Sequence, residues 1–224
     1  MVQATATRPS GDATRERPRP RSGWLAIVGL LVLSVLPIVG GVARLGDLGG
    51  EPQNTPPAAV TVAIVAHIVA MSVFCVLGAL QFSPALRRQS RWHRTVGRAL
   101  IPLGFIAALS SIVLVVLFAG RPEELPLAQI RLVFGVAMTA VLIPAVIAIR
   151  RRDFAAHGAW MTRAYALAIS GGTQAIAAIV VAAIVGELDA SAEAWAVAAG
   201  FVTNSVVAEL LIRRRSGRNR SRSA

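Results

Sequence analysis

The chain has 224 residues, of which 55% are hydrophobic and only 15% are charged, and its mean hydropathy is +0.63. Soluble globular proteins carry about 25% charged residues, so this composition excludes an ordinary soluble domain. The formal net charge of +12 comes from 23 arginines with no lysine. Because these arginines flank long apolar runs, they indicate membrane topology and not a nucleic-acid partner.

The sequence predicts an all-α integral membrane bundle of six transmembrane helices between two polar tails. Residues 1–22 are rich in Thr, Pro, Arg and Ser and are expected to form a disordered cytosolic tail, and residues 213–224 a second, basic one. Each apolar segment between them has about 20 residues or more, which at about 1.5 Å per residue matches a hydrocarbon core of about 30 Å. The predicted helices are 23–45, 58–82, 96–120, 126–149, 161–186 and 191–212.

The arginines predict the orientation of this bundle. Twenty of them fall into four clusters, at 8–21, 87–98, 150–163 and 213–222, and the intervening loops hold most of the acidic residues. Arginine-rich loops stay in the cytosol, so both termini are expected to be cytosolic. The protein is expected to be a multi-pass protein of the plasma membrane with anionic lipid head groups against its cytosolic face. The sequence does not identify a protein partner.

The sequence lacks the common catalytic and metal-binding motifs. A Gly-rich phosphate loop, a paired-carboxylate site, a Ser nucleophile motif and a close His/Asp/Glu cluster are all absent from it. Cys75 is the only cysteine, so neither a disulfide nor a Cys-based metal motif is available. Hydrolase and kinase activities are therefore disfavoured and no metal site is predicted. Whether the protein is an enzyme stays open.

His67 is the histidine that the sequence places near the middle of the membrane. It lies about nine residues, hence about 13 Å, from the outer end of its predicted helix. An ionisable group at this depth is a candidate functional residue, although a neutral histidine bonded to a neighbouring helix is an equally good interpretation. Gln81 projects from the same helical face about four turns further on. One wall of this helix is therefore expected to be polar at two depths.

His93 and His157 are both expected at the cytosolic boundary, just ahead of the third and fifth predicted helices. Their similar depth allows them to share one site, whereas His67 lies about 20 Å away along the membrane normal and cannot share a haem iron with either of them. Together with nearby basic and aromatic residues they would form a site for an anionic head group, a quinone or a haem b propionate. The additional candidates are Arg98, Arg163, Tyr165 and Trp160. Interfacial histidines bonded to loop carbonyls or lipid are the alternative.

Several other polar residues inside the apolar segments are expected to have structural roles. Glu209 is the only acidic residue within a helix on the cytosolic side, so we expect it to form an ion pair with Arg98 or Arg163. Arg131 is expected to extend to the outer membrane surface. Asn204 and Gln174 are expected to form interhelical hydrogen bonds.

These residues resemble the signature of a family of predicted bacterial membrane proteins, domain of unknown function 2306. The resemblance covers about residues 58–212 and is most specific between His157 and Ala166. One departure is Gln174, where a basic residue would be expected. The family's activity is uncharacterised, so the resemblance implies a bundle of six or seven helices and no particular activity. The matching residues are His67, Gln81, Phe82, His93, Arg94, Gly97, Arg98, His157, Trp160, Met161, Arg163, Tyr165, Ala166, Asn204 and Glu209.

Three functions remain open on this evidence. The favoured one is a cofactor-binding or ligand-binding membrane protein of the haem or quinone type, with its site at the inner face around His93 and His157. The alternative is a small-molecule or ion transporter that uses His67 as a protonation site in mid-membrane. The third is a non-catalytic membrane component whose arginine-rich tails bind lipid or a partner.

Overall fold

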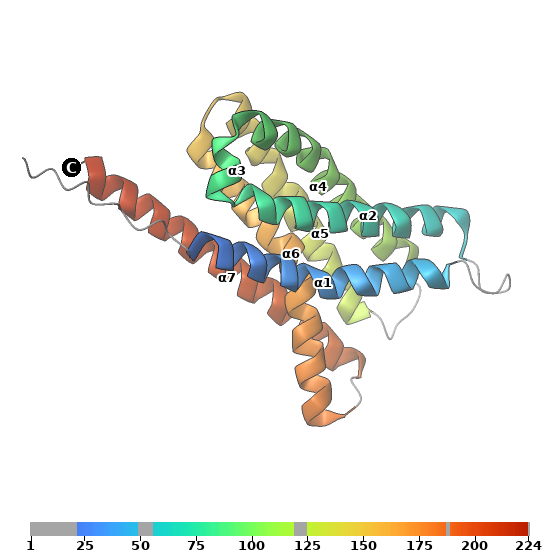
Figure 1. The fold of residues 1–224 in the computed structure, drawn as a ribbon. Coiled ribbons are helices and arrows are strands. Elements are labelled where there is room, and N and C mark those ends of the chain that lie inside the picture. The colour runs from blue at the N-terminus through green and yellow to red at the C-terminus, as the bar shows by residue number, and fades with distance from the viewer. Residues whose placement is uncertain (1–21, 49–55, 119–124, 187–188, 224) are drawn as a thin grey trace, which may run out of the picture.

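The computed structural model describes residues 22–48, 56–118, 125–186 and 189–223, and these ranges contain seven helices and no strand. Six of the helices are long and apolar enough to cross a membrane, which confirms the prediction of an all-α fold with six such helices. The exception is a short helix, α3, in the connection between the second and third of them (Figure 1). The helices are α1 (Ser22–Asp47), α2 (Ala58–Gln81), α3 (Pro84–Arg88), α4 (Ser90–Phe118), α5 (Leu125–Arg150), α6 (Phe154–Val185) and α7 (Ala190–Ser223).

Three helices extend beyond the apolar segments that the sequence marks. Helix α4 begins six residues before 96, α6 begins seven residues before 161, and α7 continues through Ser223, well past 212. Hydropathy identifies only the part of a helix that lies in hydrocarbon, whereas polar turns continue the same backbone hydrogen bonding into water. The expected tail at 1–22 lies outside the described residues except for Ser22, where α1 begins.

Side-chain caps fix where three of the helices begin. The Ser83 hydroxyl accepts a hydrogen bond from the backbone amide of Leu86 at the start of α3. The Asp153 carboxylate accepts one from Ala156 ahead of α6, and the Asp189 carboxylate accepts one from Ala192 ahead of α7. Each cap satisfies an amide that has no partner inside its own helix.

The bundle is built around four helices that pack in succession. Helix α2 packs on α4, α4 on α5 and α5 on α6, while α1 lies across α2 and α6, and α7 lies along α6 and α5 (Figure 1). The largest core cluster draws its side chains from α2, α4, α5 and α6. Its buried members are Phe74, Cys75, Ala79, Leu100, Ala108, Met138, Leu142, Ala164, Tyr165, Leu167, Ala168 and Ile169.

Two glycines allow the outer helices to approach this core closely. A Cβ atom added at Gly172 would overlap the Leu33 carbonyl, so α1 and α6 can cross in contact only because α6 has glycine there. A Cβ atom at Gly78 would lie 2.7 Å from the ring of Tyr165. Gly78 therefore provides the space on α2 in which the Tyr165 ring lies.

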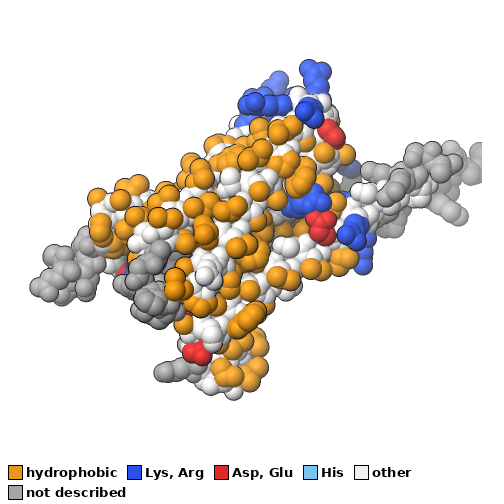
Figure 2. All heavy atoms as spheres, turned by 180° about the vertical axis from the view of Figure 1, so that it is seen from behind, with side chains coloured by type: hydrophobic (Ala, Val, Ile, Leu, Met, Phe, Trp, Pro, Cys, Tyr) orange, Lys and Arg blue, Asp and Glu red, His pale blue; other side chains and the backbone are white. Residues whose placement is uncertain are grey.

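Charged side chains separate the two ends of the bundle. We call the end that carries Arg87, Arg88, Arg150–152 and Arg213–215 the basic end, because the α2–α4 and α5–α6 connections and the last turns of α7 all lie there. The first turn of α1 also lies there, since Gly23 is next to Pro84 of α3. Figure 2 shows hydrophobic side chains over most of one face and arginines gathered toward one end. That the basic end faces the cytosol stays a prediction.

Candidate functional site

The structure brings Arg163 and Glu209 together near the basic end. Arg163 Nε and Nη2 donate to the two carboxylate oxygens of Glu209 at 2.5 and 3.1 Å, and the Arg163 guanidinium carbon lies 4.5 Å from the centre of the Trp160 ring. Arg98 is exposed and makes no ion pair with any described residue. Both oxygens of Glu209 are thus occupied by Arg163, and this group joins α6 to α7.

Tyr165 lies in the core and not beside this ion pair. Only 4% of it is exposed, and its hydroxyl donates to the carbonyl of Cys75 at 3.1 Å. The ring packs edge-on against Phe82, with centroids 5.1 Å apart, and also lies near Phe74. Tyr165 therefore packs α6 against α2, and its hydroxyl already has a protein partner.

His93, His157 and Gln81 gather at the basic end of α2, α4 and α6. His157 Nδ1 lies 2.9 Å from the carbonyl of Ala145, and the Gln81 amide donates to the carbonyl of His93 at 3.3 Å. Within the described part of the chain, His93 Nδ1 and Gln81 Oε1 are buried without a hydrogen-bond partner. His157 is therefore bonded as an interfacial histidine would be, whereas the other two leave polar atoms unsatisfied.

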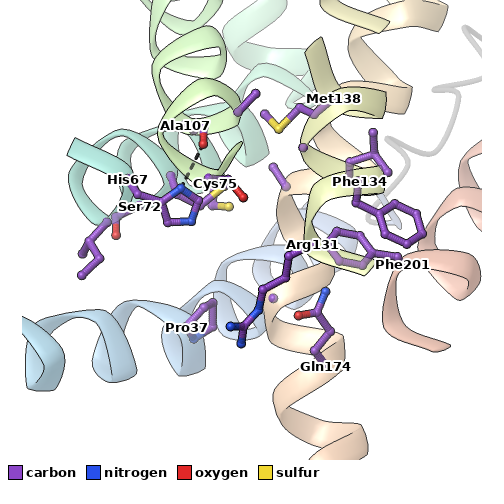
Figure 3. Close-up of a pocket in the computed structure, with 18 of the residues that line it drawn as sticks. Pro37, His67, Ser72, Cys75, Ala107, Arg131, Phe134, Met138, Gln174 and Phe201 are labelled. Carbon is purple, nitrogen blue, oxygen red and sulfur yellow. Dashed lines mark hydrogen bonds between the residues drawn. The ribbon is translucent and has the colours of Figure 1, made fainter. Parts of the chain in front are cut away.

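A second group of candidates surrounds a cavity of about 220 Å³ on the other side of the core, which we call the His67 chamber (Figure 3). All six membrane-crossing helices contribute to its wall. Its polar and aromatic lining is the part that could select a ligand. This part comprises His67, Ser72, Cys75, Ser111, Arg131, Phe134, Gln174 and Phe201, and the apolar remainder includes Met71, Met138 and Leu167.

The hydrogen bond of His67 sets the chemistry of its ring. His67 Nδ1 lies 2.9 Å from the carbonyl of Ala107 on α4. A carbonyl can only accept, so Nδ1 carries the proton and the neutral ring has its lone pair on Nε2. In Figure 3 that second nitrogen lies on the side of the ring away from Ala107, at the chamber. His67 thus offers the chamber a hydrogen-bond acceptor that can also take up a proton.

Arg131 and Gln174 supply hydrogen-bond donors to the same chamber. Arg131 extends from α5 toward Pro37 and Gln174 (Figure 3). Its acidic partner among the described residues is Glu193 of α7 at 3.7 Å, and both side chains are about half exposed, at 50% and 48%. Gln174 Nε2 is buried without an acceptor among the described residues. The expectation that Arg131 simply extends to the surface therefore omits its place in the chamber wall.

The helices behind these residues hold them in position. Asn204 of α7 donates to the Thr173 hydroxyl at 2.7 Å and to the carbonyl of Gly200 at 3.1 Å, which ties α7 to α6. A Cβ atom at Gly200 would lie 2.6 Å from Gln174 Cγ, so the Gln174 side chain passes directly over Gly200. Phe134 and Phe201 stack with ring centres 3.8 Å apart and join α5 to α7. The chamber wall is therefore held by its own interhelical contacts.

Sequence reasoning named His67 and Gln174 but missed the chamber that they share with Arg131. The available signal was Arg131 itself, since it lies inside an apolar segment about two turns from the end of its helix. Ser72, Ser111, Phe134 and Phe201 carry no comparable signal, because small hydroxyl and aromatic side chains are common throughout membrane helices. No group of three or more His, Cys, Asp or Glu that could hold a metal ion occurs in the described ranges.

Comparison with known proteins adds a family and no activity. The model of a family described as "Predicted membrane protein (DUF2306)" matches residues 64–212, which include His67 and nearly all of the chamber wall. No curated protein and no solved structure matches the chain.

Proposed function

The chain belongs to the family of predicted membrane proteins called domain of unknown function 2306, and we propose that this multi-pass membrane protein binds a small molecule in the His67 chamber. The observation that carries the proposal is a cavity of about 220 Å³ lined by a histidine, an arginine and an amide within an apolar bundle. Pockets for drug-sized ligands have about 300–1,000 Å³, so the ligand is a smaller molecule. Such binding is also the first step that a transporter needs.

The polar atoms of the chamber support this proposal. His67 Nε2 and the Arg131 guanidinium are costly groups to keep inside a membrane bundle unless they have a task there. Gln174 Nε2 adds a buried donor without an acceptor in the described part of the chain. A ligand with polar and apolar parts would satisfy these groups and fill the space beside Phe134 and Phe201.

The residues favoured from sequence at the basic end fit this role less well. Arg163 and Glu209 bond each other, and Tyr165 is enclosed in the core. We retain a quinone or haem at the basic end as the second candidate, because His93 Nδ1 and Gln81 Oε1 are buried without partners among the described residues. A haem absorbance band that is lost in His157→Ala, or a co-purified quinone lost in Gln81→Leu, would favour that site over the chamber.

We also propose that the basic end lies in the cytosol against anionic head groups. Its arginines follow the rule that cytosolic loops are enriched in Arg and Lys, and each adds about 1 kcal/mol of attraction to an anionic surface. Fusion of a reporter active only in the cytosol to the end of α7 tests the orientation. Activity supports the proposal, and activity restricted to a reporter placed in the α1–α2 connection overturns it.

A thiol reporter tests ligand binding in the chamber. Since Cys75 is the only cysteine, a Cys75→Ala background allows one thiol to be placed by Ser72→Cys in the chamber wall. The matched control is Val69→Cys on the same helix, which is 49% exposed on the outer face of the bundle. Both thiols are treated with methyl methanethiosulfonate in nanodiscs, with and without benzyl alcohol, a small neutral probe.

We expect benzyl alcohol to slow modification in Ser72→Cys and not in Val69→Cys. The probe would occupy the chamber in the first variant, whereas lipid covers the thiol in the second. Equal rates with and without probe in both variants, for benzyl alcohol and for benzoate, would refute binding in the chamber.

A further inference from the structure

At one side of the His67 chamber, hydrogen-bond donors outnumber hydrogen-bond acceptors. The Arg131 guanidinium carries five N–H donors and no acceptor. Gln174 Nε2 adds a buried donor without a partner in the described ranges, and Gln174 lines the same chamber as Arg131 (Figure 3). No acidic residue is among the described residues that line the chamber. A ligand that satisfies this side must therefore present acceptors and preferably a negative charge.

Glu193 provides only a weak counter-ion for Arg131. The closest approach, between Arg131 Nη2 and Glu193 Oε1, is 3.7 Å, which is longer than a hydrogen bond. Both side chains are about half exposed, so solvent screens the pair and it contributes little. The guanidinium thus has donors available for a better-placed anion, and displacing Glu193 costs little.

The remainder of the wall describes the other part of the ligand. Beyond Arg131 and Gln174 the chamber is bordered by the stacked Phe134 and Phe201 and by Met138. Aromatic and thioether side chains suit a flat apolar body. A single guanidinium balances one negative charge, and a second charge would stay uncompensated in this apolar setting.

We propose that the His67 chamber binds a small monocarboxylate, with its carboxylate on Arg131 and Gln174 and its apolar body toward Phe134 and Met138. This inference rests on the proposed function, because it assigns the chemical class of the ligand in the same chamber. A cation would meet Arg131 without a compensating acid among the described residues of the wall, and a neutral molecule would leave the charge of the guanidinium without a close partner. The carboxylate can come from a free small acid or from a fatty acid of the bilayer.

The test uses probes of one shape and three charges. Benzoate, benzamide and benzylamine are compared by the concentration that halves the rate of thiol modification in Ser72→Cys, in the Cys75→Ala background. We expect benzoate to act at a concentration at least about tenfold lower than the other two, as for a ligand that accepts hydrogen bonds from a charged group. Octanoate distinguishes the two sources of the carboxylate. Stronger protection by octanoate than by benzoate would indicate a fatty acid of the bilayer, and weaker protection would indicate a free small acid.

Substitution of Arg131 completes the test. We expect Arg131→Gln to raise the half-protecting concentration of benzoate about tenfold and that of benzamide much less, because the uncharged probe loses no ion pair. The matched control is Arg44→Gln, because Arg44 also lies near an acid, Asp47 at 3.9 Å, but is not in the chamber wall, so both probes should protect the thiol as before. If Arg131→Gln disturbs folding, Gln174→Leu gives a second test, in which benzoate protection should fall more than benzamide protection.

The two proposals fail in different ways. Equal protection by benzoate, benzamide and benzylamine would refute the monocarboxylate and leave ligand binding in place. Benzoate protection that Arg131→Gln and Gln174→Leu both leave unchanged would also refute it. If none of these probes nor benzyl alcohol protects the thiol, the proposed function fails as well.

Discussion

The guanidinium of Arg163 on α6 and the carboxylate of Glu209 on α7 face each other in a bidentate ion pair, with hydrogen bonds of 2.5 and 3.1 Å. The two side chains are 28% and 40% exposed, so solvent screens the pair only in part. The Trp160 ring lies against the other side of the guanidinium. The consecutive helices α6 and α7 are thus joined near the basic end by residues 46 positions apart in the chain.

We expect Glu209→Ala to lower the stability of the bundle by about 1–2 kcal/mol, since it leaves a partly buried guanidinium without its acceptors. The midpoint of thermal unfolding in detergent measures this loss. Arg98→Ala is the control, because Arg98 is exposed on α4 without an ion pair among the described residues. Equal losses in the two variants would show that the pair contributes nothing beyond the removal of a charge.

Gly78→Ala should destabilise the contact between α2 and α6. The added methyl group would lie 2.7 Å from two atoms of the Tyr165 ring, and this ring is buried with its hydroxyl bonded to Cys75. Overpacking of this kind costs about 1–3 kcal/mol, and the same unfolding assay measures it.

Gly97→Ala is the matched control for this substitution. Gly97 lies in α4, and a Cβ atom there meets no other atom within 4 Å. Removing helical glycine without a clash stabilises by about 0.4–1 kcal/mol. A loss of stability in Gly97→Ala as large as that in Gly78→Ala would contradict the overlap with Tyr165.

Hydropathy was sufficient to predict the six membrane-crossing helices, because a bilayer demands long apolar segments whatever their partners. It could not predict α3 or the early start of α4, since these turns are polar and their helical state depends on local caps such as Ser83. The depth of His67 in the membrane is inferred only from its position along α2 and stays a prediction. The bond of His67 to Ala107 could not be predicted, because the side-chain direction relative to α4 depends on how the two helices pack.

The chamber was harder to predict than the fold for the same reason. Arg131 and Gln174 are far apart in the chain, and only the packing of α5 against α6 places both in one wall. Tyr165 shows the converse: its place in the sequence beside Arg163 suggested a shared pocket. Side chains at successive helix positions differ in direction by about 100°. Two side chains that are two positions apart therefore point to nearly opposite sides of the helix. Tyr165 therefore turns into the space above Gly78 while Arg163 turns to α7.

The cap at the start of α7 should depend on pH. Hydrogen bonds from the backbone amide of Ala192 and the hydroxyl of Ser191 hold the pKa of Asp189 below its usual value. A lowered folded-state pKa means that the cap is fully formed above the unfolded pKa of about 3.9 and is lost as pH falls through the folded-state pKa. Amide exchange at Ala192 should therefore lose protection under acid conditions.

Asp189→Asn separates titration from capping in this experiment. Asparagine keeps an oxygen that can accept the Ala192 hydrogen bond but does not titrate. We expect protection at Ala192 to become independent of pH in this range in Asp189→Asn and to be low at every pH in Asp189→Ala. The same acid-dependent loss in Asp189→Asn would assign the effect to another group.

Glu193→Gln should strengthen the binding of an anion in the His67 chamber. Among the described residues, Glu193 is the acid that pairs with Arg131, at 3.7 Å, and it is not part of the chamber wall. It therefore competes with a ligand carboxylate for the guanidinium without contacting the rest of the ligand. Removing its charge should lower the half-protecting concentration of benzoate several-fold. This corresponds to a gain in binding free energy of about 1 kcal/mol at most, because the pair is half exposed.

Benzamide, which has no charge, should protect the thiol in Ser72→Cys to the same extent with or without Glu193→Gln. Weaker benzoate protection in Glu193→Gln would instead mean that Glu193 orients Arg131 toward the chamber and does not compete for it.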